Sequence, residues 1–525
     1  MRPGFVLEVD ERTPPLLVHR GEGMSLERFP LGTRVVYPPE PLPGLPDVRA
    51  AIAAALEQPM DSAPLRVRLR PGMRLTIAFD DISLPLPPMR TPDVRQQVIE
   101  QVLELAAAAG VDDVELVVAN ALHRRMTGPE IRRIVGERVY RSFWPHALTN
   151  HDAEDRDNLI HLGLTDQGED VEINKRAGTS DLIVYVNVNL VSMDGGWKST
   201  AIGLASYASL RHHHNSRTMR HSRSFMDHKA SALHSSAWRM GRLLQEHVPV
   251  FQIETTLNNQ AFPRSYGFLT RREWEWSPRD QATYWAVKNG LDRAPSRLRR
   301  KAFSDLVADY EVTSVQAGAV EPVHERTIEH VHRQQLVEVQ GQSDVLVFGL
   351  PYLCPYNVNS SVMNPVLAMC LGLGYFFNMY RGQPLVRKGG ALILYHPVTN
   401  AFDALHHPSY VDFFEEVLAE STDPAVIEER FEKQYATDPW YSHLYRTSHA
   451  YHGVHPFYMW YWGAHALEHL GDVVWVGGDP KAVERMGMRS ASTLQDALQM
   501  VSGTVGASPT ITYQHNPPHS IADVR

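Results

Sequence analysis

A strand, a glycine turn and a histidine cluster follow one another between residues 181 and 215. Residues 181–190 are apolar and rich in β-branched side chains, which predicts a strand. Residues 201–211 predict a helix of about three turns. The loop between them carries Gly195, Gly196, Lys198 and Ser199, and the helix leads to His212, His213 and His214. An amine and imidazoles within one such unit indicate a cofactor or metal site.

Less specific interpretations of this stretch stay open. The loop superficially resembles a phosphate-binding P-loop, but Trp197 and Ser192 stand where that motif requires glycines. A Gly-Gly pair is most often a simple turn. Histidines near a helix C-terminus are commonly solvated and are favoured there by the helix dipole.

The whole-chain composition excludes several classes of protein. The 525 residues are 43% hydrophobic and carry a net charge of −9, which is typical of a globular protein and argues against nucleic-acid binding. We find no signal peptide and no apolar run long enough to span a membrane, so we expect a cytoplasmic protein without a membrane partner. The cysteines, Cys354 and Cys370, predict buried thiols rather than a disulfide framework.

Strands and helices alternate along the first half of the chain. Residues 74–79 and 114–119 predict strands, and a helix that ends near Gly110 separates them. This order predicts an α/β fold with mainly parallel sheets and helical crossovers. The loops that follow the strands at Asp80, Asn120 and Asn187 would face one crevice, because ligands collect at the carboxyl ends of parallel strands.

We expect two α/β domains with the active-site cleft between them. Residues 1–325 would form a cofactor-binding domain with an insertion at 264–318, and residues 326–525 would form a substrate-covering domain. The aromatic and histidine-rich patch at 451–462 is most simply interpreted as helix packing. Residues 517–525 are expected to be a disordered tail.

Several loops at this crevice resemble the lactate racemase family that uses a nickel-pincer nucleotide. Residues 81–85, Asp-Ile-Ser-Leu-Pro, lie where the family has Asp-x-Thr-Arg-Pro, and residues 121–127 are similar to its Gly-x-His-Arg segment. Residues 195–199, Gly-Gly-Trp-Lys-Ser, are similar to Gly-Gly-Arg-Lys-Ser. His214 follows Lys198 by 214 − 198 = 16 residues, the spacing of the family's metal-binding histidine.

This resemblance, clearest over residues 74–215, implies a two-domain fold and a cofactor. The cofactor is a pyridinium-3,5-bisthiocarboxylic acid mononucleotide that holds nickel through sulfur, carbon and sulfur. By the resemblance, Lys198 would tether it through a thioamide, His214 would complete a planar Ni(II) site, and His123 would be the catalytic acid–base group. The other residues implied to bind the cofactor are Asp81, Ser83, Gly195, Gly196 and Ser199.

Departures from the family concern the substrate. Lactate-acting members have a second acid–base histidine ten residues before the lysine, and position 198 − 10 = 188 is Val188 here. Leu84 and Leu367 replace the cations that hold a carboxylate, so lactate is an improbable substrate. We instead expect a sugar acid, hydroxy acid or polyol, with its hydroxyls bound by Asn187, Asn189, Asn364 and Tyr458.

The sequence therefore predicts an isomerase, a racemase or epimerase that works by reversible hydride transfer. Its partners would be a hydroxylated small molecule and the separate proteins that synthesise the cofactor. One alternative keeps the cofactor but performs oxidation–reduction or isomerisation without net racemisation. Another is a non-catalytic protein that binds a nucleotide or metal.

Overall fold

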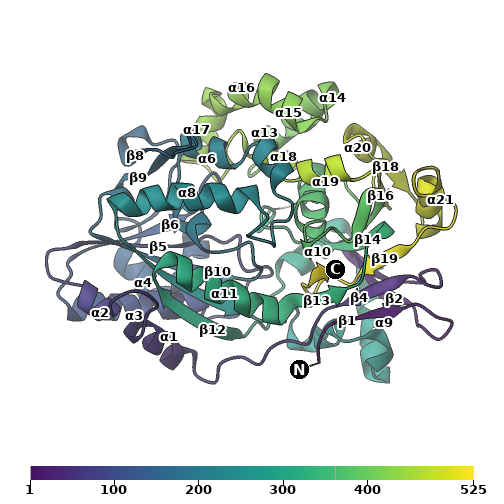
Figure 1. Cartoon of the computed structure of the whole chain (residues 1–525), viewed down its shortest axis with the longest axis horizontal. Coiled ribbons are helices and arrows are strands. Elements are labelled where there is room, and N and C mark those ends of the chain that lie inside the picture. The colour runs from purple at the N-terminus through teal and green to yellow at the C-terminus, as the bar shows by residue number, and fades with distance from the viewer. Residues whose placement is uncertain (1, 361) are drawn as a thin grey trace.

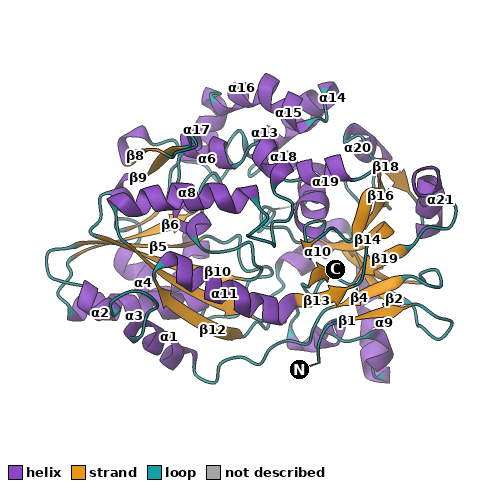
Figure 2. Cartoon of the chain, viewed as in Figure 1, coloured by secondary structure: helices purple, strands orange, loops and turns teal. Residues whose placement is uncertain are grey.

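The computed structural model describes residues 2–360 and 362–525. Its strands gather in two groups, each flanked by helices (Figure 2). A first sheet has the order β12-β11-β10-β5-β6-β7, and its strands are parallel except for the β11–β12 pair. These strands are β5 (Arg74–Asp80), β6 (Asp113–Ala119), β7 (Leu148–Asn150), β10 (Leu182–Asn189), β11 (Val250–Leu257) and β12 (Val312–Gly318). The predicted α/β class with mainly parallel sheets is confirmed.

Side-chain alternation along β10 assigns each residue to one face of the first sheet. Leu182, Val184, Val186 and Val188 enter the core beneath the helices α1 (Val48–Glu57), α3 (Val94–Ala108) and α4 (Gly128–Phe143). Ile183 and Tyr185 enter the other core, together with residues of α8 (Ala232–His247). Asn187 and Asn189 share the parity of Tyr185, so they lie on this second face.

A second sheet has the order β1-β4-β19-β14-β16-β17-β18, with the hairpin β2–β3 attached to β14. Its later strands are β14 (Ser343–Pro351), β16 (Val386–Tyr395), β17 (Asp472–Val476), β18 (Arg489–Ala491) and β19 (Ile511–Gln514). Its N-terminal strands are β1 (Phe5–Glu8), β2 (Leu16–Gly21), β3 (Gly23–Glu27) and β4 (Arg34–Tyr37). Figure 1 shows these purple strands beside the yellow β19, away from the first sheet.

The first 37 residues thus belong with the C-terminal strands by hydrogen bonding, although we expected an N-terminal unit to begin at residue 1. The expected division at 325/326 stays a prediction. Within the expected insertion, α9 (Pro278–Arg293) and α10 (Ser296–Ser304) lie outside the first sheet, but β12 is an edge strand of it.

The C-terminal tail is ordered, which contradicts the expectation of disorder. Strand β20 (Ile521–Val524) pairs in parallel with β13 (Leu336–Val339) and with β15 (Tyr380–Gly382). Ile521 and Ala522 are fully buried there. The order comes from long-range pairing and burial, which the local composition of the tail does not reveal.

The remaining helices complete the two halves. In the N-terminal half they are α2 (Leu65–Arg68), α5 (Lys175–Gly178), α6 (Tyr207–His213), α7 (Ser216–His221) and α11 (Val320–Gln335). The strands β8 (Leu159–Leu164) and β9 (Asp170–Asn174) form a hairpin. In the C-terminal half the chain forms α12 (Pro365–Met369), α13 (Pro408–Asp412), α14 (Leu418–Glu420), α15 (Pro424–Ile427), α16 (Lys433–Ala436), α17 (Pro439–Thr447), α18 (His455–Tyr461), α19 (Ala464–His469), α20 (Pro480–Arg485) and α21 (Leu494–Val505). Over the described residues, no helix combines the length and apolarity that crossing a membrane requires.

Candidate active site

A cavity of about 230 Å³ lies where loops of the first sheet meet helices of the C-terminal half. Most of the residues expected from the sequence line it: Asp81, Ser83, His123, Asn187, Gly195, Lys198, Ser199, His214 and Tyr458. Gly196, Asn189 and Asn364 do not line it. The structure thus brings together side chains that are far apart in the sequence and come from both halves of the chain.

The loop after β5 orients His123. Asp81 accepts a hydrogen bond from the backbone N–H of Ser83 at 2.9 Å, and its other carboxylate oxygen lies 2.7 Å from Nδ1 of His123. Burial acts to raise the pKa of Asp81, but His123 and Ser83 outweigh it and the pKa is lowered. Asp81 therefore stays a carboxylate that fixes the imidazole ring, and this contact to His123 differs from the cofactor contact that we expected of it.

The loop that carries His123 has an unusual backbone conformation. Ala121 lies in the left-handed region at φ 46°, and its N–H donates to the carbonyl of Gly203 at 2.9 Å. This is the position at which the family pattern has glycine, the residue that adopts such a conformation without strain. The backbone at Ala121 thus has a conformation that glycine would adopt at lower cost.

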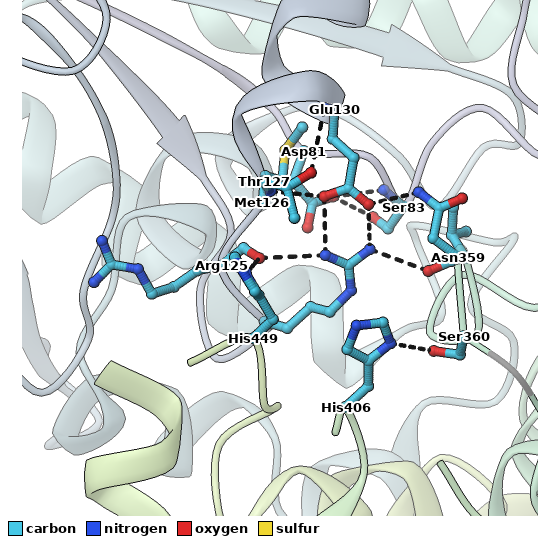
Figure 3. A network of polar contacts seen from close by, with 12 residues as sticks. Asp81, Ser83, Arg125, Met126, Thr127, Glu130, Asn359, Ser360, His406 and His449 are labelled. Atoms are coloured by element: carbon cyan, nitrogen blue, oxygen red, sulfur yellow. Dashed lines mark hydrogen bonds and ion pairs between the residues drawn. The ribbon is translucent and has the colours of Figure 1, made fainter. Parts of the chain in front are cut away.

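Arg124, the residue after His123, is not available to a substrate. Its guanidinium donates to both carboxylate oxygens of Glu130, at 3.0 and 2.7 Å, and to the carbonyl of Val358 at 3.1 Å. Figure 3 shows Glu130 at the centre of this network, where it also accepts from Asn359 of the C-terminal half. These contacts join the two halves, and Glu130 neutralises the charge of Arg124.

Lys198 begins a π-helix, η2 (Lys198–Ile202), which replaces the first part of the helix we expected over residues 201–211. The chain then breaks, and α6 begins after Ser206. Trp197 is fully buried against Gly241 of α8, where a β-carbon on the glycine would lie 2.3 Å from the indole. This contact anchors the residue before Lys198, and so positions the lysine at the cavity wall.

Burial lowers the pKa of Lys198, although Asp194 and Asp80 act to raise it. A lower pKa increases the share of neutral amine, which is the nucleophilic form.

Asp80 was not among the residues we expected. Its carboxylate accepts from Val188 N and Asn187 Nδ2, both at 2.7 Å, and burial raises its pKa to about 7.

The paired glycines serve packing rather than phosphate binding. The N–H of Gly196 donates to Glu254 at 2.7 Å, so it is already satisfied. A β-carbon at Gly196 would lie 2.7 Å from the ring of His324, and one at Gly195 would lie 2.6 Å from Glu254. Both glycines have positive φ, at 91° and 61°. Gly195 reaches the cavity, whereas Gly196 faces the Glu254–His324 pair.

His214 is partly buried at the C-terminal end of α6, where its ring stacks on Tyr458 at 5.3 Å between centroids. Its Nδ1 has no hydrogen-bond partner among the described residues. Burial, with smaller effects of Lys198 and His123, lowers its pKa to about 3, so the imidazole is neutral at pH 7. A neutral imidazole with a free nitrogen is suited to bind a metal. Of its neighbours, His212 contacts Asp170 and His213 packs in the core, and neither lines the cavity.

Asn189 and Asn364, expected as substrate contacts, serve the fold instead. Asn189 donates to the carbonyl of Thr255 at 3.3 Å, and Asn364 caps α12 by accepting from Leu367 N at 3.0 Å. Val188, the position aligned with the family's second histidine, points into the core on the opposite face of the sheet. Val188 does not line the cavity, whereas Tyr185 and Asn187 of β10 do.

Sequence and structure comparisons place the chain among known proteins. Residues 23–227 match the family model of the lactate racemase N-terminal domain. This part of the chain is therefore similar to the N-terminal domain of the lactate racemase family. The lactate racemase apoprotein from Thermoanaerobacterium thermosaccharolyticum has a similar structure, with a TM-score of 0.63 and 16% identity over 97% of this chain and 99% of that chain. This likeness supports a common fold.

More distant similarity adds little. A protein from Thermotoga maritima has a TM-score of 0.46 and 10% identity over 91% of this chain and 97% of that chain, and carries no argument. No curated protein sequence matches this chain significantly. Among the described residues, no group of three or more His, Cys, Asp or Glu side chains could hold a metal ion alone.

Proposed function

We propose that this protein is a member of the lactate racemase family, and that it is a racemase or epimerase of a hydroxylated small molecule that uses a nickel-pincer nucleotide. The observation that carries the proposal is that Lys198, His214 and His123 line one cavity. When bound, the cofactor would supply a hydride acceptor that returns the hydride to either face of a ketone. The donor set fits it, because Lys198 is a partly buried amine with a lowered pKa and His214 is a neutral imidazole with an unpartnered nitrogen.

In this proposal the protein binds, orients and moves a proton. Lys198 would hold the cofactor covalently, and His214 would bind its nickel. His123, oriented by Asp81, would take the hydroxyl proton of the substrate at Nε2 and return it to the oxygen of the product. Leu84, Leu122, Phe303 and other apolar residues of the lining would exclude water.

The cavity favours a neutral polyol or sugar over a small carboxylate. Among the described lining residues, Lys198 is the only lysine or arginine, and the proposed thioamide would remove its charge. Arg124 is neutralised by Glu130, and Leu84 lies in the wall where the family has arginine. A carboxylate there would lack a cation, whereas hydroxyl groups can bond to Asn187 and Tyr458.

Intact-protein mass spectrometry after co-expression with the cofactor-synthesis proteins tests the proposal. We expect a cofactor adduct and nickel in the wild type and in Lys175→Ala, which removes an exposed lysine, but not in Lys198→Ala. The loaded protein should then epimerise members of a panel of polyols, sugars and sugar acids, and act less well on lactate. A wild type without an adduct would refute the proposal. Accumulation of a free ketone would favour an oxidoreductase.

A further inference from the structure

A second histidine faces the cavity from the C-terminal half. His455, the first residue of α18, lines the same cavity as His123. The two ring centroids are 5.6 Å apart and the rings are nearly perpendicular, at 84°. His455 is therefore close enough to reach a hydroxyl group that is bound beside His123, and it approaches from a different direction.

The position of His455 is built into the fold. The hydroxyl of Tyr410 lies 2.5 Å from its Nδ1, and the rings of Tyr451 and Tyr356 flank it at 4.3 and 4.8 Å between centroids. The backbone N–H of His452 donates to the carbonyl of Leu122, the residue before His123, at 3.2 Å. The segments that carry the two histidines are thus tied together directly.

One nitrogen of His455 is left for a ligand. Its Nε2 is buried and has no hydrogen-bond partner among the residues the structure describes. Buried polar atoms are nearly always paired, so an unpaired one at a cavity wall indicates a bound group. Its neighbour His407 also has one unpartnered ring nitrogen, Nδ1, while its Nε2 bonds to the carbonyl of Tyr356 at 2.9 Å, but His407 does not line the cavity.

We propose that His455 is the second acid–base group of the reaction, which rests on the function proposed above. His123 would serve the hydroxyl of one configuration and His455 that of the other. In the second case the O–H bond breaks and its proton passes to Nε2 of His455, while the C–H hydrogen leaves with its electron pair for the hydride acceptor that the cofactor supplies. Return of hydride and proton forms the opposite configuration.

The electrostatic surroundings agree with this role. Burial, with smaller effects of His123, His407, His214 and His452, holds the pKa of His455 well below its usual range. Burial thus favours the neutral imidazole, whose Nε2 has a lone pair for a proton in the tautomer in which Nδ1–H donates to the oxygen of Tyr410. Position 188 cannot supply this group, since its side chain lies on the other face of the sheet.

Single-turnover assays of the loaded His455→Gln protein test the assignment. We expect epimerisation to fall by about 10²–10⁴-fold, with the Lys198 adduct and nickel unchanged. Ketone trapped with hydroxylamine should still form from one configuration but not from the other. His407→Gln, which removes a buried histidine of the same cluster, should keep the wild-type rate within a few-fold. Wild-type ketone formation from both configurations in His455→Gln would overturn the assignment while leaving the proposed function intact.

A second readout does not depend on turnover. In the ¹⁵N-histidine-labelled apoprotein, the resonances of His455 are identified by their absence from His455→Gln. They should shift when D-sorbitol or D-gluconate is added, and His407 should not respond. Unchanged His455 resonances with both compounds would contradict the inference. His455→Asn serves as a second variant if His455→Gln fails to fold by circular dichroism.

Discussion

At the residue scale, two adjacent carboxylates at the end of β5 have opposite electrostatic settings. Asp81 bonds to His123 and Ser83, and its pKa is lowered despite burial. Asp80 is buried beside Asn187 and Val188, and its pKa is raised. The two adjacent carboxylates thus make different contacts: Asp81 orients the imidazole of His123, and Asp80 bonds to β10.

Replacing Asp81 with asparagine should reduce turnover while leaving cofactor loading intact. Asparagine cannot fix His123 in the same tautomer and cannot stabilise the imidazolium, so we expect kcat to fall by on the order of 10²-fold or more. The measurement is steady-state epimerisation, with the Lys198 adduct followed by mass spectrometry. Ser83→Ala, which removes only a supporting hydrogen bond, should cost much less. Equal losses in the two variants would refute the orienting role.

Replacing Asp80 with asparagine should stabilise the protein at alkaline pH. A carboxyl whose pKa is raised on folding contributes stability below its unfolded value of 3.8, and this is lost as pH rises through about 7. Asparagine can accept from Val188 and Asn187 without a charge. The Tm of Asp80→Asn relative to wild type should therefore rise by at least about 2 °C between about pH 5 and about pH 8.

The opposite sign at Asp81 provides the control for that measurement. Its lowered pKa contributes stability above the unfolded value, and this is lost as pH falls. Asp81→Asn should therefore be most destabilising near neutral pH. If the Tm of both variants relative to wild type changed with pH in the same direction, the two carboxyl groups would not have pKa shifts of opposite sign.

At the scale of elements, strand parity and one strained turn decide which side chains reach the cavity. The alternation along β10 turns Asn187 toward the cavity and Val188 away from it. At the end of β6, the left-handed Ala121 turns the chain so that His123 faces Asp81. These local geometries connect the sheet to the chemistry of the site.

Ala121→Gly should be neutral or stabilising, which is unusual for a change from alanine to glycine. Glycine adopts φ 46° without the steric cost of a β-carbon, about 1 kcal/mol or more. Chemical denaturation should show a free energy of unfolding that is unchanged or raised by up to roughly 1 kcal/mol. Ala53→Gly, at an exposed position inside α1, should instead cost about 1 kcal/mol. A similar loss in both variants would contradict the strain at Ala121.

At the scale of the whole molecule, the cavity exists only because both halves close on it. His214 from the first half stacks on Tyr458 from the second, and Arg124 reaches across to Val358. The N-terminal strands β1 and β4 join the sheet of the C-terminal half, so the chain passes between the halves more than once (Figure 1). Binding at this junction should stabilise the arrangement of the two halves.

The cofactor-loaded protein should therefore unfold at a higher temperature than the apoprotein. A ligand that binds only the native state stabilises that state by about 2.7 kcal/mol when its concentration is 100 times its Kd. A covalent link would keep such a ligand bound. Differential scanning calorimetry of loaded and unloaded wild type checks this. Lys198→Ala expressed under the same conditions should show the lower transition. Identical transitions for loaded and unloaded wild type would place the adduct outside the junction.

The sequence determined the α/β class, the strands β5, β6 and β10, and the cavity residues His123, Lys198 and His214, because periodicity and short spacings are local properties. It misjudged the C-terminal strand β20 and the break between η2 and α6, where pairing with distant segments outweighs local preference. From the sequence we also interpreted Val188 as the position at which a second acid–base histidine is missing. Only the tertiary structure showed that this position faces the wrong core and that His455 faces the cavity, because the face of a strand and the contacts of distant segments are set by packing.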